Sequence, residues 1–87
     1  MTDSLTVMQK PSIVRMVIVP MDPNRNNGAD EAPAIITRVW SDTYINVKVL
    51  SDSNDAPEWR TSVTLLEEKP ERIIGDGRGM AWWPPRV

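Results

Sequence analysis

The sequence predicts an all-β protein, a small SH3-like barrel of four or five antiparallel strands. Its 87 residues allow one small domain. Short runs rich in β-branched residues are separated by clusters of Pro, Asn, Asp and Gly, which form turns. No segment shows the 3.6-residue period of a long amphipathic helix. An OB-type barrel is the alternative, although no segment supplies a helix for it.

The first expected strand covers residues 12–19 and ends at Pro20. Residues 1–11 are mostly polar, and we expect them to form a flexible N-terminal arm. The remaining residues, 12–87, are expected to form a single domain. Apolar residues nearly fill both faces of the strand, so we expect it to be central or covered on both sides. Residues 21–33 are rich in Pro and Asn and are expected to be a loop.

Residues 34–40 and 44–50 are expected to form an antiparallel hairpin around a tight turn at 41–43. The second of these runs alternates regularly, so one face carries apolar residues and the other carries polar ones. The apolar residues are Ile45, Val47 and Val49, and the opposite face carries Tyr44, Asn46 and Lys48.

Residues 58–66 are the fourth expected strand, after a turn cluster at 51–57. Strict alternation would place Trp59, Thr61, Val63 and Leu65 on one face of it. The glycines in residues 71–79 indicate a flexible connection, and residues 81–83 are expected to form a short fifth strand that Pro84 ends.

The composition argues against several classes of function. The net charge is -2, from 10 basic and 12 acidic side chains, which does not suit a non-specific nucleic-acid binder. The chain has no His and no Cys, so we expect no enzyme, no metal site and no cofactor. No apolar run approaches the ~20 residues of a membrane helix, and the first residues do not look like a secretion signal. We therefore expect a cytosolic protein.

Four short motifs follow one another along the chain, each occurring once. They are Ile36-Thr-Arg-Val-Trp-Ser-Asp42, Val47-Lys-Val-Leu-Ser-Asp52, Glu68-Lys-Pro70 and Trp83-Pro-Pro-Arg-Val87. In this order, over about residues 12–87, they resemble a set of short bacteriophage proteins with a V-x-R-V-W-x-D strand and a C-terminal W-x-W-P-x-R-V tail. This chain departs from that pattern at Ala81, where those proteins have a tryptophan, and at Trp82, where a histidine is common. The resemblance implies a phage-encoded β protein in the host cytoplasm and implies no activity.

The polar side of the hairpin carries the candidate ligand site, formed by Arg38, Trp40, Tyr44 and Lys48. Aromatic rings stack on nucleotide bases and cations bind phosphates, so this mixture suits a small anionic nucleotide. Arg60 or Arg78 is expected as a second phosphate contact. Arg78 belongs to the glycine-rich segment 75–79, which is either a flexible connector or a loop that cradles phosphate. The alternative is that these residues form an ordinary exposed sheet face without a ligand, and that Trp40 caps the core of the barrel.

The adjacent residues Trp82 and Trp83 are expected to face opposite sides of the last strand. One indole would then fill the core, and the other would cover an edge or anchor an interface. Because a chain of this size has a thin core, an outward indole favours a homo-oligomer.

Two functional hypotheses follow. The first is a non-catalytic phage counter-defence protein that binds and sequesters a small nucleotide-type immune signal, such as a cyclic oligonucleotide. The second is a protein–protein interaction module that docks a host or virion protein through its Trp-rich C-terminal tail.

Overall fold

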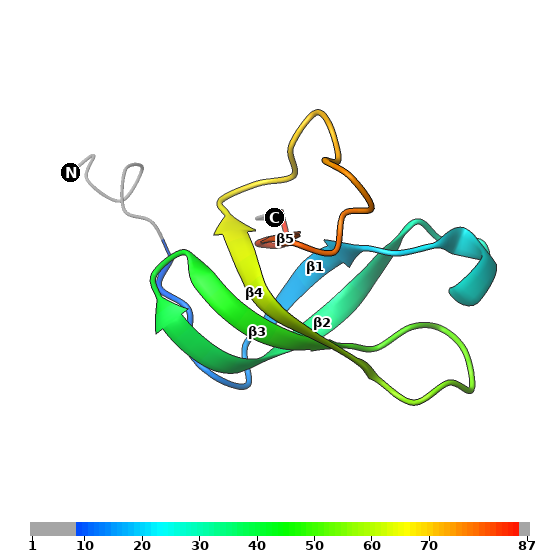
Figure 1. The fold of residues 1–87 in the computed structure, drawn as a ribbon, viewed down its shortest axis with the longest axis horizontal. Helices are drawn as coiled ribbons and strands as arrows, with labels where there is room; N and C mark the ends of the chain where they lie inside the picture. The colour runs from blue at the N-terminus through cyan, green and yellow to red at the C-terminus, as the bar shows by residue number, and fades with distance from the viewer. Residues whose placement is uncertain (1–8, 86–87) are drawn as a thin grey trace.

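Five strands close into a barrel in chain order, and β5 returns to pair with β1 (Figure 1). The computed structural model describes residues 9–85. The strands are β1 (Met16–Pro20), β2 (Glu31–Ser41), β3 (Tyr44–Val49), β4 (Glu58–Leu66) and β5 (Met80–Trp82), and a short 3₁₀ helix, η2, lies at Pro23–Arg25. The predicted small all-β barrel is confirmed. Among the described residues, no helix is long and apolar enough to span a membrane.

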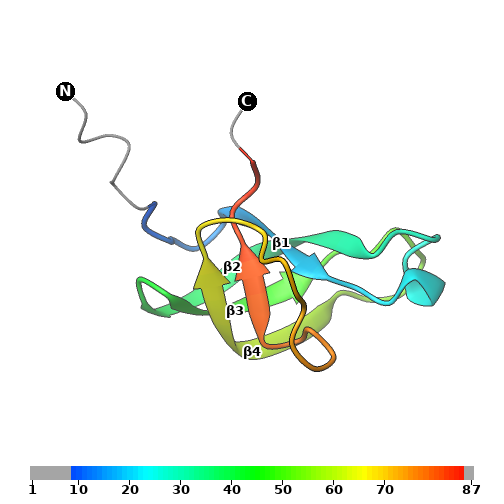
Figure 2. The ribbon, with the colours of Figure 1, turned by 90° about the horizontal axis from the view of Figure 1, so that it is seen from above.

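One of the five strand pairings is parallel, whereas the sequence predicted antiparallel strands throughout. Figure 2 shows β4 and β5 side by side with their arrows in the same direction. The other four pairings are antiparallel. A parallel neighbour requires the chain to cross back to its starting end, and residues 67–79 are long enough to do this.

The first two strands begin at other positions than the sequence predicted. Val14 has a φ of 82°, and β1 begins only at Met16. β2 begins at Glu31 and includes Pro33, whereas the composition predicts a loop there. This proline has no N–H, but its carbonyl accepts a hydrogen bond from the backbone N of Leu50 (2.9 Å), just past the end of β3.

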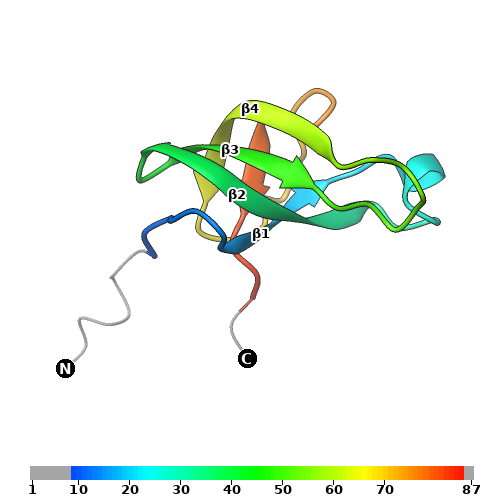
Figure 3. The same cartoon turned by 90° about the horizontal axis from the view of Figure 1, so that it is seen from below.

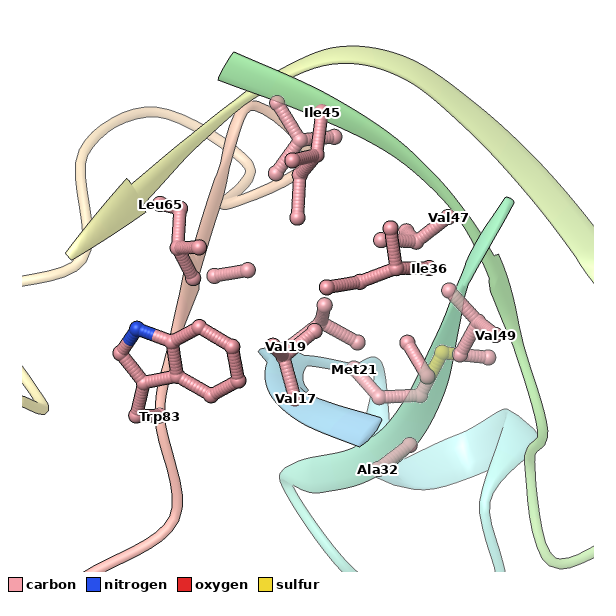
Figure 4. Packing of buried hydrophobic residues seen from close by; sticks show 13 residues of the cluster. Val17, Val19, Met21, Ala32, Ile36, Ile45, Val47, Val49, Leu65 and Trp83 are labelled. Atoms are coloured by element: carbon pink, nitrogen blue, oxygen red, sulfur yellow. The ribbon is translucent and has the colours of Figure 1, made fainter. Parts of the chain in front are cut away.

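The barrel interior is filled by alternate residues of all five strands and by Trp83 (Figure 4). As predicted, Ile45, Val47 and Val49 of β3 all face inward and are at most 1% exposed. Burying these side chains takes apolar surface out of water, which is the main favourable contribution to folding.

A β-bulge in β4 reverses the direction of one tryptophan. Ile45 lies opposite Val63, but Val47 lies opposite Arg60, so β4 contributes one more residue than β3 over this interval. The extra residue is accommodated near Ser62, whose φ is 56°. Trp59 therefore faces solvent and is 62% exposed, whereas Val63 is fully buried. The predicted common face for Trp59, Val63 and Leu65 is wrong.

The C-terminal tail docks on its own barrel. Trp83 donates its backbone N–H to the carbonyl of Leu66 (3.2 Å), and its ring belongs to the core. Trp82 faces the other side of β5, where the ammonium of Lys69 lies 5.9 Å from its ring centre. The two indoles are 1% and 2% exposed, so the predicted outward indole is wrong. Residues 67–79 cross over this side of β5, and alternation alone cannot reveal such a cover.

Candidate functional site

Polar and aromatic side chains gather on the solvent side of β2, β3 and β4. Figure 3 shows β1 to β4 side by side in that order. We call the exposed aromatic and cationic residues of these strands the outer face. They are Arg38, Trp40, Tyr44, Lys48 and Trp59.

The best-ordered part of the outer face is built on Asn46. The carboxamide oxygen of Asn46 accepts hydrogen bonds from the indole N–H of Trp40 (3.0 Å) and from the backbone N–H of Ser62 (2.9 Å). Arg38 lies opposite Asn46 on β2, and its guanidinium carbon sits 4.2 Å from the Trp40 ring centre. Because Asn46 is only 6% exposed, its oxygen is a buried anchor for the Trp40 indole N–H, while Trp40 itself remains 53% exposed.

Lys48 and Tyr44 lie on the same strand as Asn46, to either side of it. Lys48 is directly opposite Trp59 of β4, so an ammonium and an exposed indole are cross-strand neighbours. Tyr44 lies at the turn end of β3 and is 43% exposed.

The structure thus brings Arg38, Trp40, Tyr44 and Lys48 to one face, but it does not form the shared concavity that the sequence suggested. None of the main hollows on the surface of the described residues is lined by any of these four side chains. The outer side of a small closed barrel curves away from its own centre, so its side chains fan out.

Arg60 lies apart from the outer face. It is opposite Val47, on the barrel's inner side, and is 7% exposed. Its guanidinium donates to Glu58 Oε2 (2.7 Å), to the carbonyl of Pro20 (2.9 Å) and to the sulfur of Met21 (3.5 Å). These partners occupy three of its five N–H donors and tie β4 to the end of β1.

Arg78 comes close to Arg60 through the glycine-rich segment, which is folded against the barrel. Gly77 is buried with a φ of 78°, and a Cβ there would meet Pro20 and Ile73 at 2.8 Å. The carboxylate of Asp76 accepts a hydrogen bond from the backbone N of Arg78 (3.0 Å). Segment 75–79 therefore presents Arg78 beside Glu58.

Three arginines surround one carboxylate, and we call Glu58, Arg25, Arg60 and Arg78 the Glu58 cluster. Besides its bond from Arg60, Glu58 lies 3.6 Å from Arg25 Nη1 and 3.5 Å from Arg78 Nε. Burial raises the pKa of Glu58, but the hydrogen bond from Arg60 and the charges of Arg60, Arg78 and Arg25 outweigh it and hold the pKa below its usual value. Glu58 is therefore ionised at neutral pH.

The hollows differ in charge. Two small ones, of about 230 and 210 Å³, open over the Glu58 cluster, and the second is also lined by Trp59. A larger one, of about 600 Å³, lies on the other side, between the first and last described residues. Among the described residues, its lining carries Glu31, Glu67 and Glu68 and one cation, Lys69, so these residues give it a negative charge.

Sequence reasoning missed Trp59, Glu58 and Arg25. Strict alternation predicts the wrong face for Trp59 because it does not include the bulge, and no local pattern connects Arg25 with Glu58.

Within residues 9–85, no group of three His, Cys, Asp or Glu side chains could hold a metal ion. No family model matches the chain, and neither does any curated protein or solved structure.

Proposed function

We propose that this chain is a non-catalytic binding protein for a small anionic ligand of the nucleotide type, held on the outer face. The observation that carries the proposal is the pairing of each exposed indole with a cation: Arg38 over Trp40, and Lys48 beside Trp59. An indole binds any base by stacking, at about 1–3 kcal/mol per base, and the neighbouring cation binds the phosphate.

The openness of the outer face supports a homo-oligomeric form of the proposal. A single copy can cover only one side of a ligand, whereas tight binding usually buries most of the ligand surface. A second copy closing over the outer face would supply the other wall. The resemblance to phage proteins supports a role in counter-defence, in which the host-cell ligand is an immune signal such as a cyclic oligonucleotide and is sequestered without chemistry.

A protein–protein interaction module remains the second candidate, in an altered form. Trp82 and Trp83 are buried, so a partner would meet the outer face rather than the tail. Exposed Trp40, Trp59 and Tyr44 are the kind of side chains that anchor protein interfaces. Removing residues 80–87 would not test this candidate, because it would delete β5 from the barrel.

Calorimetric titration with a panel of linear and cyclic nucleotides tests the nucleotide proposal. We expect Trp59→Ala to lose about 1–3 kcal/mol of binding, or roughly 5- to 150-fold in affinity. Lys48→Ala should also weaken binding, because a phosphate contact is lost.

The matched controls are Ile74→Ala, an exposed apolar residue in the crossover, and Lys10→Ala, an exposed cation outside the strands. Both should bind as the unaltered chain does. If no nucleotide in the panel gives heat with the unaltered protein, the proposal fails, and binding to a protein partner becomes the leading explanation for the exposed rings.

A further inference from the structure

Two guanidinium groups of the Glu58 cluster lie beside Glu58 and keep their hydrogen-bonding capacity. The side chains of Arg25 and Arg78 are 47% and 57% exposed, and both point their charge at the Glu58 carboxylate. Their separations from it, 3.6 and 3.5 Å, are those of ion pairs. Within residues 9–85 neither guanidinium makes a hydrogen bond, so both retain their N–H donors for a ligand.

The backbone on each side of the hollow is fixed by short-range contacts. Arg25 ends η2, whose first residues are capped by the carboxylate of Asp22 through the backbone N of Asn24 (3.0 Å). The next residue, Asn26, accepts a hydrogen bond from the backbone N of Asp52 and donates to the carbonyl of Glu31 (2.8 Å). Arg78 is fixed by the close approach of Gly77 to Pro20. The two arginines thus line one hollow whose backbone is fixed by these contacts.

Charge alone would not draw a bare anion into this hollow. Its lining has three arginines, and three carboxylates balance them: Asp22, Glu58 and Asp76. Asp22 and Asp76 accept hydrogen bonds from backbone N–H groups, but Glu58 Oε1 is buried and has no hydrogen-bond partner among the described residues. Arg25 Nη1, at 3.6 Å, is the cation beside this oxygen. A phosphoryl group that binds here must therefore gain its affinity from hydrogen bonds to the exposed N–H donors of Arg25 and Arg78 rather than from the net charge of the hollow.

We propose that Arg25 and Arg78 bind a phosphoryl group of the nucleotide. This rests on the proposed function. Trp59 lines the adjoining hollow together with Glu58 and Arg78, so a base stacked on its indole has its sugar and phosphate directed at the cluster. The phosphoryl group belongs either to a terminal monoester or to an internal diester of a cyclic molecule.

The test is a calorimetric comparison of adenosine, adenosine 5′-monophosphate and a cyclic dinucleotide on the full chain. We expect the phosphate to raise affinity over the nucleoside by about tenfold or more, as charge-assisted bonds to arginine do. Arg25→Ala combined with Arg78→Ala should abolish that gain.

The control is Lys10→Ala combined with Arg72→Ala, which removes the same two charges at exposed positions outside the cluster. It should keep the full gain from the phosphate, and thermal melts should show every variant folded. Whichever of the monophosphate and the cyclic dinucleotide depends more on Arg25 and Arg78 identifies the source of the phosphoryl group.

If the arginine variant keeps the gain while Trp59→Ala still weakens binding, the phosphoryl site is overturned and the proposed function stands. If none of the three compounds binds the unaltered protein, both are overturned.

Discussion

Trp83→Ala should lower the free energy of unfolding by about 3–5 kcal/mol. Trp83 is 2% exposed and packs in the core, where Figure 4 shows its ring near Val17 and Leu65. Removing the ring leaves a cavity that closed strands cannot fill by collapsing. Since small domains have only about 5–15 kcal/mol of stability in total, this one change removes a large share of it.

Urea unfolding followed by circular dichroism measures the loss, and Trp59→Ala is the matched control. It makes the same chemical change at a residue that is 62% exposed, and we expect a change within about 0.5 kcal/mol. Equal losses in the two variants would show that the tail is not part of the core.

Arg60→Ala should cost about 3–5 kcal/mol of stability, because it breaks a largely buried ion pair. The change leaves the Glu58 carboxylate without its 2.7 Å hydrogen bond and the Pro20 carbonyl without its donor. We therefore expect Arg60 to stabilise the folded barrel, although the sequence suggested it as a phosphate contact.

Arg25→Ala is the matched control, since it removes another arginine of the same cluster from a half-exposed position. Exposed ion pairs contribute about 0–1 kcal/mol, so this variant should unfold almost as the unaltered protein does. A stable Arg60→Ala protein with weakened nucleotide binding would reverse this assignment and return Arg60 to the ligand site.

Local patterns predicted the strands well, because each strand's main determinants lie within a few residues. The β-branched alternation of Tyr44–Val49 and the polar turn before it define β3 and the hairpin. The limits of β4 also follow from the turn signals on either side of residues 58–66. The composition predicted a loop at Pro33, although this residue lies in β2. A proline fits into a strand only where no neighbouring strand requires a hydrogen bond from its backbone N, and this depends on the tertiary structure.

The candidate site was only partly predictable. Tyr44 and Lys48 share a face through the alternation of β3, but Arg38 and Trp40 reach that face only because a register shift between Ile36 and Arg38 reverses the alternation of β2. The orientation of Trp59 likewise depends on a bulge that no Gly or Asn announces, since Ser62 adopts its positive φ there. The Glu58 cluster unites η2, β4 and the crossover loop, and only the three-dimensional closure of the barrel brings these segments together.

The most direct test of the outer face is the set of indole N–H signals in an NMR titration with the tightest nucleotide of the panel. The chain has four tryptophans, and single Trp→Phe variants assign their signals. Binding on the outer face predicts that the Trp40 and Trp59 signals shift while those of Trp82 and Trp83 stay in place. Shifts confined to Trp82 and Trp83, or no shift at all, would contradict it.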